Sequence, residues 1–171
     1  MENLKALIRD VPDFPTPGIL FRDITPLLGH ATGLRQTVQW MADRFQTSGV
    51  ELVAGIESRG FIFGAPLAVA LGTGFVPIRK LGKLPSTTIR REYELEYGSN
   101  HLEVHADAIR PGQRVLLVDD VLATGGTAAA SVELVEELGG VVVAAAFVIE
   151  LAGLRGRARL PGREVYSAIS Y

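Results

Sequence analysis

The stretch around Asp119 and Asp120 constrains the fold of this chain more than any other part of its sequence. Arg114–Val118 is an apolar run that ends at these two acids. A turn rich in Thr and Gly follows, and then Gly126–Leu138, which has a helical composition. This order predicts a buried strand, a tight turn and a helix. In open α/β sheets, ligands bind beyond the carboxyl ends of the strands, so we expect a binding site at this turn.

The rest of the chain alternates between strand-like and helix-like segments. Apolar runs predict strands at 52–56, 74–78, 141–149 and 164–169, and helical patterns predict helices at 2–9, 34–47 and 60–71. Strands that alternate with helices indicate a mainly parallel sheet with helices on both faces. We therefore expect an α/β fold with a central, mainly parallel sheet of about five strands in a single domain.

Other segments have the composition of loops and exposed surfaces. Residues 10–26 are rich in Pro, Gly and Asp, and the polar stretch 81–100 is long enough to predict a lid or functional arm. Beyond it, apolar and polar residues alternate, which predicts a strand with His101, Glu103 and His105 on a solvated face. Residues 153–163 carry four arginines, which we interpret as a solvated helix face.

Composition excludes several classes of protein. The chain has no Cys, which excludes disulfides, thiolate metal sites and Cys nucleophiles. Its net charge of −2 argues against a nucleic-acid partner. Phe61–Ile78 is uncharged, but Pro66 and Pro77 interrupt it, so we expect core rather than a membrane span. The first ten residues carry charges and fit no signal peptide, so we expect a cytoplasmic protein.

The turn after the predicted strand has the chemistry of an anion site. Gly125 and Gly126 let the backbone approach a ligand, and their N–H groups lie at a helix N-terminus, where a phosphate is stabilised. Thr124 and Thr127 add hydroxyl groups. The paired carboxylates that precede the turn can accept hydrogen bonds from two ribose hydroxyls or hold the water shell of Mg²⁺. The alternative is a plain strand-to-helix turn with solvated acids.

This stretch resembles the phosphoribosyl-pyrophosphate signature of the type I phosphoribosyltransferases. Four further stretches are similar to the members of that family that use adenine, and they occur in the same order: Asp13–Thr25, Glu57–Phe61, Arg79–Pro85 and Leu95–Gly98. The resemblance implies one phosphoribosyltransferase domain over residues 1–171, with a small hood mainly from residues 1–30 and a mobile catalytic arm at about 81–100. The segment 85–93 is the least similar to the family.

The resemblance implies a purine salvage reaction, in which adenine and phosphoribosyl pyrophosphate give AMP and pyrophosphate with Mg²⁺ as cofactor, and it implies a homodimer. The ribose and 5′-phosphate would bind at Asp119, Asp120, Ala123, Thr124, Gly125, Gly126 and Thr127, the two acids also holding Mg²⁺ through water. Pyrophosphate would bind at Glu57, Ser58, Arg59, Arg79, Lys80 and Lys83. Adenine would bind at Leu20, Phe21, Arg22 and Leu151.

The resemblance also assigns catalytic roles. Glu96 would accept or orient the proton of the attacking base as the arm closes, with Tyr97 beside it in the lid. Arg59 would act on the leaving group. The alternative for Glu96 is an ordinary surface carboxylate, and for the basic residues a solvated loop.

Two other functions stay open. One is a regulator that binds phosphoribosyl pyrophosphate without catalysis. The other is a phosphoribosyltransferase for another purine, such as xanthine.

Overall fold

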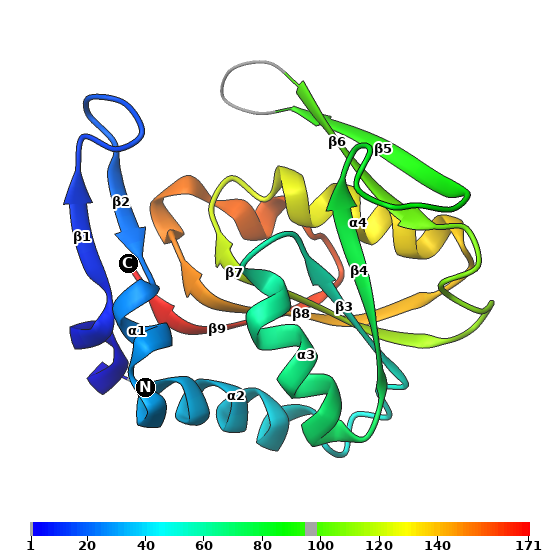
Figure 1. Cartoon of the computed structure of the whole chain (residues 1–171), viewed down its shortest axis with the longest axis horizontal. Helices are drawn as coiled ribbons and strands as arrows, with labels where there is room; N and C mark the ends of the chain where they lie inside the picture. The colour runs from blue at the N-terminus through cyan, green and yellow to red at the C-terminus, as the bar shows by residue number, and fades with distance from the viewer. Residues whose placement is uncertain (1, 95–98) are drawn as a thin grey trace.

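The computed structural model describes residues 2–94 and 99–171, which form one central sheet, a small second sheet and the helices around them (Figure 1). The strands are β1 (Arg9–Pro12), β2 (Leu20–Asp23), β3 (Leu52–Ile56), β4 (Gly74–Lys80), β5 (Thr88–Glu94), β6 (Ser99–His105), β7 (Arg114–Leu122), β8 (Val141–Glu150) and β9 (Glu164–Ser170). The helices are α1 (Thr25–Gly29), α2 (Ala31–Phe45), α3 (Gly60–Leu71) and α4 (Gly126–Glu137), with 3₁₀ turns η1 (Glu2–Leu7), η2 (Ala152–Leu154) and η3 (Gly156–Arg159).

The central sheet has the strand order β5-β6-β4-β3-β7-β8-β9. The pairs formed among β4, β3, β7, β8 and β9 are all parallel, whereas β6 pairs with β4 and β5 in antiparallel fashion. The predicted mainly parallel sheet is therefore confirmed. Because parallel strands that share a sheet end at the same edge, the loops after β3 and β7 lie next to each other.

Alternation along the strands gives the sheet two apolar faces. On β3 and β7, Ala54 and Leu117 belong to the core that α4 covers. Their neighbours Val53 and Leu116 point to the opposite face and pack in the core that α1, α2 and α3 cover. All four side chains are fully buried, as expected for strands that are covered on both faces. None of the helices among the described residues is long and apolar enough to cross a membrane.

Three segments differ from the sequence-based expectation. Residues 10–26, predicted as a loop, contain the antiparallel pair β1–β2, in which Val11 lies opposite Phe21. The arm at 81–100 contains β5 and part of β6, which pair from Thr88 and His105 onward. The segment 153–163 forms short 3₁₀ turns rather than one helix. The short strands depend on pairing that a local pattern does not reveal. The 3₁₀ turns close through hydrogen bonds over three positions.

Phe75 on β4 fills a space that two glycines leave open. A Cβ on Gly55 of β3 would lie 2.6 Å from Cε2 of Phe75, and a Cβ on Gly64 of α3 would lie 2.8 Å from the same atom. The ring also packs edge-on against Phe61, with 5.7 Å between the centroids. The glycines therefore let α3 pack closely on the sheet, and this packing sets where the loop between β3 and α3 lies.

We predict that Gly55→Ala lowers the free energy of unfolding by about 1–3 kcal/mol, because the added methyl group overpacks the space against Phe75. Urea denaturation measures this change. Gly29→Ala is the control, since a Cβ there meets no atom within 4 Å. Adding Phe75→Leu to the Gly55→Ala variant should recover part of the loss. A Gly55→Ala protein as stable as the wild type would contradict this account.

Candidate functional site

A pocket opens at the edge of the sheet where β3 and β7 end. Its volume is about 260 Å³. Its walls come from the loop after β3, the end of β4, the hairpin β5–β6, the end of β7 and the turn into α4. The predicted site residues that line it are Glu57, Ser58, Arg59, Lys80, Asp119, Asp120, Ala123, Thr124, Gly125, Gly126 and Thr127. Residues from three separate parts of the sequence are thus brought to one cavity.

The turn between β7 and α4 forms one wall of this pocket. Gly125 precedes α4 with φ +83°, in the left-handed region that glycine adopts readily. No side chain caps the helix at this residue. The first N–H groups of a helix have no partner within the helix, and they carry the positive end of the helix dipole. The arrangement is suited to binding a phosphate, as the composition of the turn predicts.

The two acids at the end of β7 are buried beside a cation. The Arg59 guanidinium donates a hydrogen bond from Nε to Oδ2 of Asp120. The backbone N–H of Asp120 donates to Oδ1 of Asp119 at 2.8 Å. Burial, followed by the negative charge of Asp120, raises the pKa of Asp119 well above its ordinary value. The side chain of Arg59 therefore supplies positive charge beside two carboxylates that have little access to solvent.

Gly60 explains how Arg59 reaches the acids. A Cβ on Gly60 would lie 2.8 Å from the carbonyl oxygen of Val118 and 3.0 Å from Oδ1 of Asp119. Only a glycine at this position lets the start of α3 approach the end of β7 so closely. The peptide bond between Glu57 and Ser58, just before this contact, is cis.

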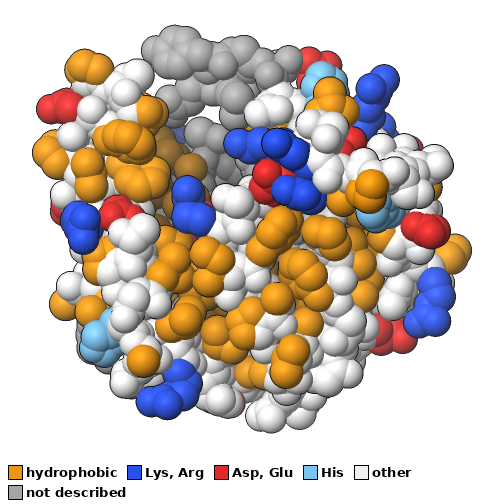
Figure 2. All heavy atoms as spheres, in the orientation of Figure 1, with side chains coloured by type: hydrophobic (Ala, Val, Ile, Leu, Met, Phe, Trp, Pro, Cys, Tyr) orange, Lys and Arg blue, Asp and Glu red, His pale blue; other side chains and the backbone are white. Residues whose placement is uncertain are grey.

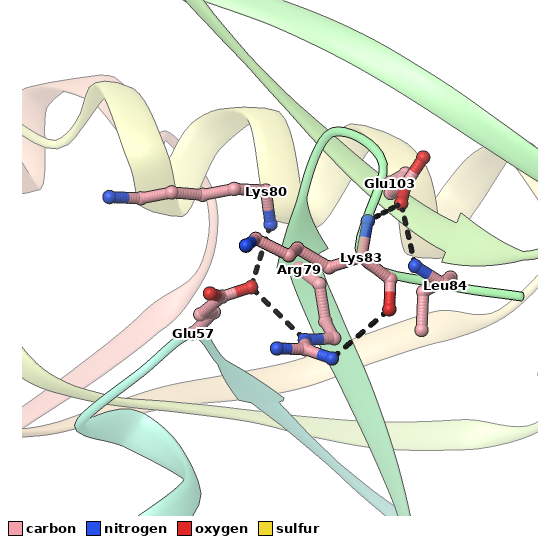
Figure 3. A network of polar contacts seen from close by, with 6 residues as sticks. All are labelled: Glu57, Arg79, Lys80, Lys83, Leu84 and Glu103. Atoms are coloured by element: carbon pink, nitrogen blue, oxygen red, sulfur yellow. Dashed lines mark hydrogen bonds and ion pairs between the residues drawn. The ribbon is translucent and has the colours of Figure 1, made fainter.

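Glu57 organises the basic residues at the end of β4. Its Oε2 accepts hydrogen bonds from Nε of Arg79 at 3.1 Å and from the backbone N–H of Lys80 at 3.0 Å (Figure 3). Arg79 also donates to the carbonyl oxygen of Lys83 at 3.1 Å. The Lys80 side chain extends away from these contacts. Lys80 therefore contributes to the pocket wall, whereas Arg79 and Lys83 do not line the pocket. Their contact connects the end of β4 to the loop that follows it.

Glu103 was expected on a solvated strand face, and this prediction is wrong. Its side chain on β6 is only 4% exposed. Oε1 accepts hydrogen bonds from the backbone N–H groups of Lys83 at 3.0 Å and Leu84 at 3.1 Å (Figure 3). Oε2 lies 3.4 Å from the hydroxyl of Thr88. The loop after β4 covers the strand and needs an acceptor for its amides, a requirement that the strand pattern alone does not contain.

The residues expected to bind adenine lie beside the pocket and do not line it. Phe21 packs edge-on against Phe14, with centroids 5.1 Å apart, and its ring lies 5.8 Å from Cζ of Arg59. Arg22 pairs with Asp10, and its guanidinium lies 3.8 Å above the ring of Tyr171.

Leu20 and Leu151 are the other two residues expected to bind adenine, and neither lines the pocket. Leu20 is 46% exposed. The backbone N–H of Leu151 donates to the carbonyl oxygen of Leu122 at 2.9 Å, which holds Leu151 next to the end of β7.

Two predicted residues, Glu96 and Tyr97, lie outside the described part of the chain. Five other residues, which the sequence patterns did not select, also line the pocket. Val121, Leu122 and Ala128 flank the predicted turn, whereas Tyr93 on β5 and Leu102 on β6 come from the hairpin. Tyr93 is an aromatic residue of the arm, three positions before Glu96 in the sequence, and this position could have indicated a role in the site. Leu102 looks like any core residue in the sequence, since only the folded hairpin turns it toward the pocket.

The acidic pair fits a magnesium ion that arrives with a phosphate ligand. Mg²⁺ usually binds to proteins through one or two carboxylates, keeps several waters and takes its other ligands from substrate phosphates. Asp119 and Asp120 provide two carboxylates next to the turn Ala123–Thr127. No group of three or more His, Asp or Glu residues that could hold a metal is found in residues 2–94 and 99–171. The donor set therefore suits a shared ion rather than a metal held by the protein alone.

Comparison with known proteins agrees with this geometry. Residues 29–166 match the model of the phosphoribosyl transferase domain, and the chain therefore belongs to the phosphoribosyltransferase family. Its full-length relatives narrow the class to enzymes named adenine phosphoribosyltransferase. The one from Carboxydothermus hydrogenoformans is 57% identical, and the one from Chloroflexus aurantiacus is 55% identical. Each match covers 99% of this chain, and it covers 99% and 98% of the two relatives, respectively.

Solved structures give the same result. The adenine phosphoribosyltransferase of Thermoanaerobacter pseudethanolicus superposes with a TM-score of 0.97 at 51% identity, over 99% of both chains. The Saccharomyces cerevisiae enzyme, solved with an imino-altritol bisphosphate and adenine, superposes with a TM-score of 0.91 at 41% identity, over 97% of this chain and 96% of that one. The predicted type I phosphoribosyltransferase fold is confirmed.

We predict that Glu103→Ala speeds hydrogen exchange at the amides of Lys83 and Leu84 by at least about tenfold. Each amide loses a hydrogen bond to a charged acceptor, which is worth about 1.5–3 kcal/mol. Exchange measured by NMR or mass spectrometry reports the rates. Glu92→Ala, which removes an exposed glutamate from neighbouring β5, should leave both rates within about twofold of the wild type. Unchanged exchange in Glu103→Ala would show that this carboxylate does not hold the loop.

Proposed function

We propose that this chain transfers the 5-phosphoribosyl group from phosphoribosyl pyrophosphate to adenine, giving AMP and pyrophosphate. It would thus be a pentosyl-transferring enzyme of purine salvage. The observation that carries the proposal is the pocket in which a helix N-terminal turn, two buried acids and the Ser58–Arg59 loop meet. The names of its full-length relatives support adenine as the acceptor.

In this proposal each wall of the pocket binds one part of the donor. The turn Ala123–Thr127 holds the 5′-phosphate through backbone N–H groups and hydroxyls. Asp119 and Asp120 accept hydrogen bonds from the two ribose hydroxyls. Positive charge from Arg59 and Lys80 stabilises the leaving pyrophosphate. Mg²⁺, bound with the donor and held by the two acids through water, would add further positive charge for the departing group.

Adenine would enter beside Phe21, which offers an aromatic face close to Arg59. Leu20 and Leu151 would line the same slot. Arg22, held by Asp10 and Tyr171, would shape the slot rather than carry charge to the reaction. Glu96 would accept or orient the proton of the attacking nitrogen, and closure of the arm around it would exclude water from the reacting carbon.

The location of the chain follows from the proposed substrates. Phosphoribosyl pyrophosphate carries several negative charges, which a bilayer does not admit without a transporter. We therefore infer that the chain works in the cytoplasm, where this donor would be available.

A product assay tests the proposal directly. The protein is mixed with Mg²⁺, phosphoribosyl pyrophosphate and, separately, adenine, hypoxanthine, guanine, xanthine or orotate, and nucleotides are resolved by chromatography. We expect AMP from adenine. If only xanthine gave a nucleotide, the proposed base would be wrong, whereas the proposed phosphoribosyl transfer would stand. Tight Mg²⁺-dependent binding of the donor without any product would favour a regulator instead.

We predict that the double variant Asp119→Asn, Asp120→Asn weakens Mg²⁺-dependent binding of phosphoribosyl pyrophosphate by at least about 100-fold. It loses two charged acceptors worth about 1.5–3 kcal/mol each. Calorimetry without adenine measures the affinity. Glu96→Gln is the comparison variant, and it should keep this affinity while its kcat falls by about 10²–10⁴-fold. If the double variant binds the donor normally, the acids do not anchor the ribose. If Glu96→Gln loses affinity and turnover equally, Glu96 is not the proton acceptor.

The outer face of α3 supports a homodimer. This helix contains no charged residue, and it exposes Ile62, Pro66 and Val69, the last with 82% of its surface accessible. Pro66 lines a groove together with Leu34 and Val38 of α2. Figure 2 shows hydrophobic side chains across this face. A helix that is apolar on all sides is typical of a buried position, so we infer that a second copy of the chain covers it.

We predict that the wild-type protein has twice the 18.3 kDa mass of one chain in light scattering, and that Val69→Asp converts it to single chains. A buried, unpaired carboxylate at the interface would oppose association. Val141→Asp is the control, since Val141 is an exposed valine at the start of β8. A wild-type protein that is monomeric, or a Val69→Asp variant that stays dimeric, would contradict this interface.

A further inference from the structure

The segment after β8 touches the back of the phosphate-binding turn. A Cβ on Gly156 would lie only 2.3 Å from the carbonyl oxygen of Ala123 and 2.9 Å from Cδ1 of Leu122. From the other side, a Cβ on Gly125 would lie 2.4 Å from the carbonyl oxygen of Gly156 and 3.0 Å from Cβ of Arg159. The two backbones are thus in direct contact, and each presents a glycine to the other. Gly156 is buried although its neighbours in the segment are exposed.

An ion pair between the exposed Arg157 and the buried Glu150 holds this segment in place. Arg157 donates from Nε and from a terminal nitrogen to the two carboxylate oxygens of Glu150, each at 2.6 Å. A third donor of Arg157 reaches the carbonyl oxygen of Val165 on β9 at 2.6 Å. The hydroxyl of Ser167 donates to Glu150 at 2.9 Å. Three elements, β8, η3 and β9, are therefore joined through one guanidinium.

The position of Glu150 connects this ion pair to the site. Glu150 is the last residue of β8, lies in register with Leu122 at the end of β7 and is 7% exposed. Hydrogen bonds from Arg157 hold the pKa of this carboxyl below its usual range, so the pair is ionised at neutral pH. A bidentate contact between Arg and a carboxylate fixes direction as well as distance. The pair therefore fixes Gly156, the residue next to Arg157, against the turn.

We propose that Gly156 is a positioning residue, which sets the shape of the 5′-phosphate turn from behind, and that the Glu150–Arg157 pair holds it there. Neither the glycine nor the pair lines the pocket. The inference rests on the proposed function, since it takes the turn Ala123–Thr127 to bind the 5′-phosphate. The amides of that turn must converge on one anion, and a shift of the Ala123 carbonyl would turn them away from it.

The test compares two glycines of the same segment. Gly156→Ala adds a methyl group that meets the backbone of the turn, whereas Gly153→Ala adds one with no atom within 4 Å. Neither glycine has a positive φ, so backbone strain does not separate the two variants. The probes are ribose 5-phosphate, which carries the 5′-phosphate, and pyrophosphate, which would bind at the Ser58–Arg59 loop. Calorimetry in the presence of Mg²⁺ measures both affinities.

We expect Gly156→Ala to bind ribose 5-phosphate at least about tenfold more weakly than the wild type and to bind pyrophosphate within about twofold of it. Gly153→Ala should match the wild type for both ligands. A Gly156→Ala protein with normal affinity for ribose 5-phosphate would overturn the inference. An equal loss for both ligands would also overturn it, because that result describes general disruption of the site.

A second pair of variants keeps the test valid if Gly156→Ala does not fold. Arg157→Lys keeps the charge and loses the bidentate contact, whereas Arg163→Lys changes an arginine of the same segment that pairs with Glu136 on α4. We expect Arg157→Lys alone to weaken ribose 5-phosphate binding about three- to tenfold, and equal affinities in the two variants would overturn the inference. The product assay on the wild type distinguishes a failure of the positioning role from a failure of the proposed function. An active wild type with insensitive variants rejects the positioning role alone, whereas an inactive wild type that also fails to bind ribose 5-phosphate rejects the proposed function and this inference with it.

Discussion

The close approach of α3 to the end of β7 determines the arrangement of the site. Gly60 allows this contact, since any side chain there would meet the carbonyl oxygen of Val118. The contact places Arg59 beside Asp120, 61 positions later in the chain, and puts a guanidinium next to two buried carboxylates. Without that cation, two acids with so little access to water would be costly to ionise. The loop after β3 and the acids near the end of β7 thus depend on each other.

The same edge of the sheet is built from backbone contacts more than from side chains. Gly60 touches the end of β7, and Gly156 touches the turn that follows it. Acidic side chains then hold each loop in place. Glu57 bonds the end of β4, Glu103 bonds the loop after it, and Glu150 bonds Arg157. These acids act as internal acceptors for backbone amides and guanidinium groups, and of the three only Glu57 also lines the pocket.

Local sequence patterns predicted the parts of the fold that local forces specify. The buried strands β3, β7, β8 and β9 and the helices α3 and α4 appear as continuous apolar runs or helical periods, and all of them lie close to where they were expected. The patterns missed β1 and β2, and they did not distinguish the buried Glu103 from an exposed acid. Short strands and buried acceptors exist because a distant segment needs a hydrogen-bond partner, and that need is not visible in a neighbouring residue.

The sequence by itself determined the mainly parallel α/β class, the Asp-Asp and Thr-Gly-Gly-Thr chemistry of one turn and, through resemblance, the family. These are properties of residue type and spacing, which act over a few positions. Only the tertiary structure decided that Arg79 braces Glu57 while Lys80 lines the pocket, and that Gly156 lies behind the turn. Such relations join residues far apart in the chain, because they arise when the loops after parallel strands are packed at one sheet edge.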